Sequence, residues 1–158
     1  MDKAAPDFSL PDTLTGPHIR LTTVCVEDAP ALFALIDANR EHLGRFLTWP
    51  ATIQSVEDEV QFIERRIKQQ QAGMEHAYLI CTRHDDAAIG MVGVFGIAWE
   101  HRTGEIGYWL AEHASGNGHM TESVEILHKA LFCAGLHRLE IQCETSNHPS
   151  AGIARRLG

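Results

Sequence analysis

The chain has 158 residues, of which 44% are hydrophobic and 22% charged, and its formal net charge is −8. This length and composition are typical of one soluble globular domain, and the negative charge argues against nucleic acid as the main ligand. The longest uncharged apolar-rich stretch, residues 87–99, is too short to cross a bilayer, and the N-terminus lacks the apolar segment of a secretory signal. We therefore expect a cytoplasmic protein with no membrane or nucleic-acid partner.

The N-terminal half of the sequence predicts a tail, a strand and two helices. Residues 1–17 contain three prolines and little periodicity, and we expect a flexible N-terminal tail there. Alternation over residues 18–26 predicts a strand. Asp28, followed closely by a proline, marks the start of a helix, and Ser55 opens a second helix with a capping-box variant that ends at Gly73. The apolar residues expected to face the core from these helices are Leu32, Phe33, Ile36, Val56, Val60, Ile63 and Ile67.

The C-terminal half predicts a sheet with one crossover connection. The expected elements are strands at 77–83, 88–99 and 103–110, a helix at 119–134, a strand at 138–144 and a short helix from Pro149. Gly90, Gly93 and Gly96 indicate bulges in the second of these strands, or a flat surface against another element. The order predicts an antiparallel meander that becomes parallel across the crossover helix. This is an α+β fold with a mixed sheet.

The cysteines and histidines give no sign of a disulfide or a metal site. The four cysteines stand singly in apolar segments without a C-x-x-C pair, which favours buried free thiols in a reducing compartment over a disulfide. None of the ten histidines stands three or four residues from another, so we predict no metal. The net charge of −8 would suit a basic substrate, although a surplus of solvated carboxylates explains it equally well.

The strongest local signal is the glycine turn Ala114-Ser115-Gly116-Asn117-Gly118-His119-Met120, which separates the strand at 103–110 from the helix at 119–134. A strand, a glycine turn and a helix N-terminus direct several backbone N–H groups to one point, where the helix dipole adds positive charge. Glycine permits positive φ and close approach of a ligand. The turn therefore predicts a phosphate or pyrophosphate site, although Gly116-x-Gly118 alone is equally compatible with an ordinary tight turn.

Four segments occur in an order that resembles a known family. Residues 39–50 contain N-R-x-x-L-x-x-F-L-x-W, residues 104–110 read G-x-I-G-Y-W-L, and residues 113–118 read H-x-x-G-x-G. Residues 147–158 contain N-x-x-S followed by R-R-L-G. Together they resemble the GNAT superfamily of acyl-CoA-dependent N-acetyltransferases, in particular the RimL/RimJ type, which acetylates protein N-termini. One departure is His113, where the family signature has Gln or Arg.

The resemblance implies a GNAT-like domain over residues 18–158. Family members continue beyond the Leu-Gly at the end of this sequence into two further strands, so the resemblance implies a domain that lacks its last two strands. The strand at 138–144 would then have an open edge, through which two chains could pair as a homodimer.

The resemblance also implies acetyl-CoA as co-substrate and assigns residues to it. Backbone groups of Trp109 and Leu110 would pair with the pantetheine arm and polarise the acetyl carbonyl. Asn147 would bind the arm from the other side, although an Asn before His-Pro is also a good turn residue. The residues expected to hold the pyrophosphate are Gly116, Asn117, Gly118, His119, Met120 and Thr121.

Glu105 and Ser150 are the candidate catalytic residues. Glu105 would accept the proton of the attacking amine, directly or through a water; alternatively it is an exposed strand-edge carboxylate. Ser150 would protonate the departing thiolate, or it is simply a hydroxyl in the first turn of a helix. Tyr108 is a weaker substitute as donor, because strand alternation places it on the face opposite Glu105.

The predicted function is acetylation of a protein N-terminal α-amino group, as in ribosomal proteins. An α-amino group with a pKa of about 8 is roughly a tenth neutral at pH 7, whereas lysine is neutral only at about a few parts in ten thousand. A single glutamate therefore suffices more easily for the terminal amine. The alternatives are acetylation of a small amine, such as an antibiotic or polyamine, and a non-catalytic acyl-CoA-binding regulatory module.

Overall fold

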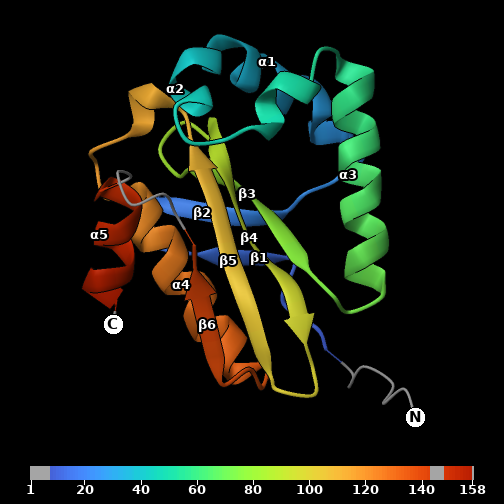
Figure 1. Cartoon of the computed structure of the whole chain (residues 1–158). Coiled ribbons are helices and arrows are strands. Elements are labelled where there is room, and N and C mark those ends of the chain that lie inside the picture. The colour runs from blue at the N-terminus through green and yellow to red at the C-terminus, as the bar shows by residue number, and fades with distance from the viewer. Residues whose placement is uncertain (1–7, 143–147, 158) are drawn as a thin grey trace.

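The computed structural model describes residues 8–142 and 148–157, which form a six-stranded sheet between two groups of helices (Figure 1). The strands lie side by side in chain order: β1 (Thr13–Thr15), β2 (Ile19–Thr23), β3 (His76–Thr82), β4 (Ala88–Ala98), β5 (Thr103–Leu110) and β6 (Arg138–Ile141). Neighbours from β1 to β5 are antiparallel, and β6 is parallel to β5. The predicted α+β class and the change of direction at the crossover are confirmed.

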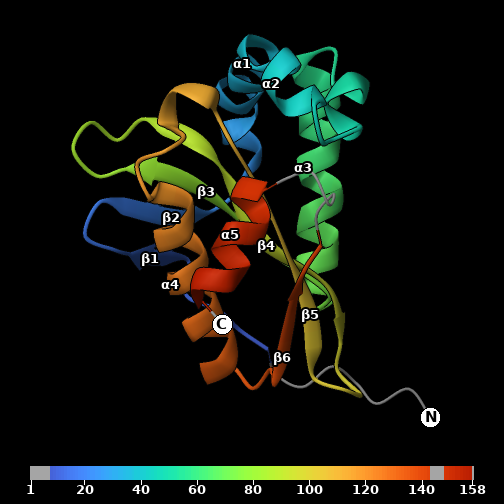
Figure 2. The same ribbon diagram turned by 60° about the vertical axis from the view of Figure 1, so that its left-hand side comes forward.

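The helices cover opposite faces of the sheet (Figures 1 and 2). One group contains α1 (Ala29–Ala38), α2 (Arg40–Gly44) and α3 (Val56–Gln71), and the other contains α4 (His119–Cys133) and α5 (His148–Leu157). Three short 3-10 helices connect these elements: η1 (Val26–Asp28), η2 (Trp49–Thr52) and η3 (Glu112–Ala114). None of the helices in the described ranges is long and apolar enough to span a membrane.

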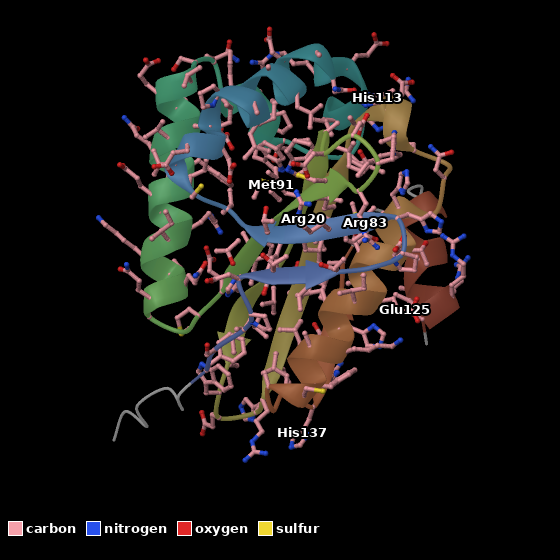
Figure 3. All side chains as sticks on the ribbon, turned by 180° about the vertical axis from the view of Figure 1, so that it is seen from behind. Arg20, Arg83, Met91, His113, Glu125 and His137 are labelled. Carbon is pink, nitrogen blue, oxygen red and sulfur yellow. The ribbon has the colours of Figure 1, made fainter. Side chains whose placement is uncertain are left out.

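Each face of the sheet has its own hydrophobic core. Ile80 and Ile106 belong to the cluster that includes the buried residues of α4. Leu79, Met91 and Trp109 belong to the cluster under α1 and α3. Figure 3 labels Met91 in a view from the β1–β2 edge of the sheet. Because successive strand residues point to opposite faces, a strand buried on both faces supplies both clusters.

Local sequence signals explain where α3 begins and where β4 bends. Ser55 Oγ accepts a hydrogen bond from Asp58 N at 3.1 Å, which confirms Ser55 as the N-cap. The Asp58 carboxylate accepts a bond from Gln54 N at 2.9 Å, one residue before the N-cap whose N–H a capping box would use. The β4–β5 register shifts between Phe95 and Ala98, and Gly96 between them has a φ of +56°. This is the bulge that a glycine in a strand indicates.

The flexible tail expected over residues 1–17 is wrong for the part that the structure describes. Thr13–Thr15 form β1, which pairs with β2, and Leu10 is only 7% exposed. The Tyr78 hydroxyl donates a hydrogen bond to the Pro11 carbonyl oxygen at 2.6 Å. This bond joins residues far apart in sequence, so no local pattern indicates that the segment is fixed.

The expectation of buried cysteines is only partly correct. Cys25, Cys81 and Cys133 are free thiols, as expected, but only Cys81 is buried. Cys25 and Cys133 are exposed, because each lies at an end of a helical segment rather than in a strand interior. Cys143 lies outside the described residues.

Candidate active site

The turn before α4 has the backbone conformation that the glycines predict. Gly116 has a φ of +81° and Gly118, the N-cap of α4, a φ of +77°. This left-handed region is costly for residues with a Cβ. A Cβ built at either glycine would meet no protein atom within 4 Å. The conformation, and not crowding by the protein, therefore requires glycine, and the space over the turn is open.

The first turn of α4 presents backbone donors to that space. The bond from Glu122 N to the Gly118 carbonyl oxygen, at 3.0 Å, is the first of the helix, and the N-cap residue, Gly118, has no side chain that could cap it. The N–H groups of His119, Met120 and Thr121 consequently have no acceptor within the helix. Together with the helix dipole they suit an anion.

The edge of β5 opens next to this turn. Pairing of β5 with β6 ends at Ile106 and Ile141 in the described residues, whereas β5 continues to Leu110 (Figure 1). Ala111 N donates to the Ile89 carbonyl oxygen at 2.8 Å, on the β4 side. Since backbone groups alternate in direction, those of Leu110 point away from β4 and those of Trp109 point towards it. The backbone role expected for these two residues fits Leu110 but not Trp109.

Trp109 contributes to the site through its side chain. The indole is 9% exposed and lies against Trp49, with ring centroids 5.9 Å apart. It shares the face of β5 with Gly107, and the Phe95 ring packs over that glycine, 3.1 Å from where its Cβ would lie.

A cavity of about 600 Å³ connects the turn, the β5 edge and the α2 region. Four groups of residues surround it: the β5 edge, the glycine turn, the segment from α2 towards η2, and α5. The lining residues are His42, Leu43, Arg45, Phe46, Leu47, Ile106, Gly107, Tyr108, Trp109, Leu110, Ser115, Gly116, Gly118, His119, Met120, Thr121, Gln142, Ser150, Ile153 and Arg156. A binding site that touches both helical layers is therefore centred where β5 and β6 separate.

Tyr108 and Ser150 meet inside the cavity. The Tyr108 hydroxyl oxygen lies 2.6 Å from Ser150 Oγ and 3.1 Å from the Ser150 carbonyl oxygen. Ser150 is 8% exposed. The two residues considered as proton donors thus form one hydroxyl pair, on the α5 side of β5.

Glu105 lies near the cavity but does not line it. It is half-buried in the middle of β5, in register with Phe95 on β4 and Glu140 on β6. It shares a strand face with Gly107 and Trp109, as alternation predicts.

The N-R pair at residues 39 and 40 holds the α2 wall in place. Asn39 Oδ1 accepts a hydrogen bond from Glu112 N at 3.0 Å, which joins the start of α2 to the connection after β5. Arg40 donates to the carbonyl oxygens of Pro50 and Ile53 at 2.8 and 2.6 Å. The motif thus positions one wall of the cavity relative to the glycine turn.

The sequence does not predict several of the residues that line the cavity, and several residues that it does predict for the site lie outside the lining. His42 and Arg45 fall within the motif at residues 39–50, but their side chains have no spacing that indicates a ligand. Asn117 is exposed and outside the lining, and so is His113, which Figure 3 shows in the turn after β5. Asn147 lies outside the described residues. No group of His, Cys, Asp or Glu able to hold a metal occurs in the described part of the chain.

Comparison with known proteins agrees with this geometry. The acetyltransferase (GNAT) domain family matches residues 18–158. The ribosomal-protein-serine acetyltransferase of Escherichia coli (strain K12) is 29% identical over 141 residues, covering 89% of this chain and 78% of that protein.

Two solved structures are similar over most of the chain. One is RimL, a ribosomal L7/L12 alpha-N-protein acetyltransferase in complex with coenzyme A, with a TM-score of 0.87, 27% identity, and coverage of 92% of this chain and 82% of that one. The other is the microcin C7 self-immunity acetyltransferase MccE with acetyl-CoA and AMP, with a TM-score of 0.85, 26% identity, and coverage of 90% and 79%. The chain belongs to the GNAT family, and it is an acetyl-CoA-dependent N-acetyltransferase, as its sequence predicts.

Proposed function

We propose that this acetyltransferase modifies the terminal α-amino group of a protein, of the kind found in ribosomal proteins. The observation that carries the proposal is the continuous cavity, which connects an anion-binding turn at residues 115–121 with a separate wall at α2. One end is suited to the phosphates of acetyl-CoA, and the other leaves room for an extended acceptor. Two relatives described above carry names for this activity, on a ribosomal-protein serine and on an alpha-N-terminus.

The residues present fit acetyl-CoA. Backbone N–H groups at His119 to Thr121 suit the pyrophosphate, and Arg156 in the lining adds a guanidinium for phosphate oxygens. Leu110 offers the backbone groups that a pantetheine arm can pair with at the end of β5. The acetyl group would then lie along the β5 edge at residues 106–110, which lines the cavity.

The two proton transfers of the reaction would take place on opposite faces of β5. Glu105 would accept the proton of the acceptor amine through a water, and the amine nitrogen would attack the thioester carbonyl. As the carbon–sulfur bond breaks, the Tyr108–Ser150 pair would deliver a proton to the thiolate. The α-amino group, with a pKa of about 8, needs little help from a base to be neutral.

The charge of the lining disfavours the small-amine alternative when that amine is a polycation. The described lining contains four basic residues and no Asp or Glu; the basic residues are His42, Arg45, His119 and Arg156. A polyamine or a polycationic antibiotic would be repelled there, whereas a peptide amine carries one positive charge at most.

A thiol-release assay with acetyl-CoA tests the proposal. One peptide has a free N-terminus and no lysine, a second has a blocked N-terminus and one lysine, and spermidine is the third acceptor. We expect release above the no-acceptor rate with the first peptide only. Release with spermidine alone would support small-amine acetylation instead, and acetyl-CoA binding without release for any acceptor would indicate a regulatory module.

A further inference from the structure

We infer that the α2 end of the cavity selects polypeptides that carry an acidic residue shortly after the terminal amine. This inference rests on the proposed function. It starts from a contrast in charge: the chain has 21 acidic and 13 Lys or Arg residues, yet no Asp or Glu of the described residues lines the cavity. The acceptor therefore meets a wall whose charge is opposite in sign to that of the whole chain.

The basic residues of the lining divide between two ends. His119 begins α4 and Arg156 lies on α5, so both are at the end suited to the phosphates. His42 lies on α2 and Arg45 follows it directly, on the wall across the cavity. Phosphates at the α4 end account for the first pair, and the second pair is left for the acceptor.

Neither residue of the α2 pair is used by the rest of the described chain. Arg45 forms no ion pair with any described residue. His42 Nδ1 is buried and has no hydrogen-bond partner among those same residues. Glu41, one turn before Arg45, and Glu112, which follows β5, are exposed and outside the lining. Arg45 is itself exposed and lines the cavity, so its guanidinium is available to a ligand carboxylate.

The length of an extended peptide determines where along it the acidic residue should stand. An extended peptide advances about 3.3 Å per residue. With its terminal amine at the β5 edge of the same cavity, we expect one of its second to fourth residues to lie against the α2 wall. A guanidinium matches a carboxylate with two parallel hydrogen bonds. Arg45 is therefore the residue that we expect to read the acidic side chain, and His42 can add a polar contact.

Peptides that differ at one position test this inference. Asp, Asn or Lys is placed at the second, third or fourth residue of an otherwise identical acceptor, and kcat/KM is measured by thiol release at low and high salt. An exposed pair is worth about 0.2–1 kcal/mol, so we expect Asp over Asn by up to about fivefold. The preference should shrink at high salt.

Two variants with the same change in charge distinguish an effect of the α2 wall on the peptide preference from an effect of the protein's overall charge. Arg45→Glu should reverse the preference in favour of Lys. Lys68→Glu, at an exposed position on α3 outside the lining, should leave it intact. Arg45→Gln, the milder variant, should abolish the preference, and the KM for acetyl-CoA should stay unchanged in all three.

Three results would overturn the inference. The first is equal rates for the Asp, Asn and Lys peptides. The second is a preference that survives in Arg45→Glu. The third is a raised KM for acetyl-CoA in that variant with an unaltered peptide preference, which would assign Arg45 to the phosphates. If no peptide supported release at all, the proposed function itself would fail, and this inference with it.

Discussion

Replacing Gly118 by alanine should separate the cofactor role of the turn from its structural role. Gly118 has a φ of +77°, and a Cβ there would meet no protein atom within 4 Å. The cost to the fold is therefore backbone strain alone, about 1–2 kcal/mol for a left-handed L-residue. For a chain of this size, that lowers Tm by roughly 2–8 °C, and the protein should remain folded.

The cost to acetyl-CoA binding should be larger. A methyl group over the turn, or a small shift of the helix start that relieves the strain, removes at least one charge-assisted hydrogen bond between an N–H group and a phosphate. Such bonds contribute about 1.5–3 kcal/mol, which corresponds to an increase of about 10- to 150-fold in Kd. Isothermal titration of the purified variant with acetyl-CoA measures this change directly.

Gly96→Ala is the matched control. Gly96 also has a positive φ, +56°, and open space around it, but it lies in the β4 bulge and outside the cavity. We expect a comparable loss of Tm and an unchanged Kd. If Gly118→Ala bound acetyl-CoA as tightly as Gly96→Ala, the turn at residues 115–121 would not be the phosphate site.

Three further predictions concern protons. Glu105→Gln should lower kcat by about 10²- to 10⁴-fold with acetyl-CoA affinity unchanged, and a rate within twofold of the parent would leave Glu105 without a catalytic role. Tyr108→Phe and Ser150→Ala should each lower kcat. The reduction in kcat of the double variant should be smaller than the product of the two single reductions, because the two hydroxyls act as one pair. Fully multiplicative reductions would contradict the pairing. Burial raises the pKa of Glu59 from 4.5 to about 7, so the fold favours its protonated form. The protonated group contributes about 3 kcal/mol to the free energy of unfolding below pH 4.5, and this contribution is lost as pH rises through about 7. Glu59→Gln should therefore raise the free energy of unfolding at pH 8 and flatten its pH dependence, as chemical denaturation at several pH values would show, and a parallel pH profile would contradict this assignment.

The parts of the fold that the sequence predicts are those with a local cause. The bounds of β5, Thr103–Leu110, match the prediction, because alternation and the following glycine turn are written in consecutive residues. The start of α3 follows in the same way from the N-cap Ser55, whose hydroxyl bonds to Asp58 three residues later. Both features are therefore signalled by residues that are close together in the sequence.

The parts that the sequence does not predict have distant causes. The segment before β2 is fixed by Tyr78, which bonds to Pro11. The short helices α2 and η2 have no apolar periodicity of their own; Arg40 connects them through the carbonyl oxygens of Pro50 and Ile53. The N-R motif is visible in the sequence, but its partners are carbonyl groups, which every residue carries, so no pattern of side chains identifies them.

The proton donor shows how the fold brings together two residues that the sequence presents as alternatives. Alternation places Tyr108 on the face of β5 opposite Glu105, and this made Tyr108 the weaker candidate while the two were expected to act on the same side. The fold places Ser150 of α5 on that opposite face, 2.6 Å from the Tyr108 hydroxyl. Since pairing of β5 with β6 ends at Ile106 among the residues that the structure describes, a thioester in the gap would be accessible from both faces. The amine can then lose its proton on the Glu105 side of β5 while the thiolate gains one on the Tyr108 side, and neither side chain has to cross the strand. The opposite orientation of Glu105 and Tyr108 therefore favours Tyr108 as part of the proton donor.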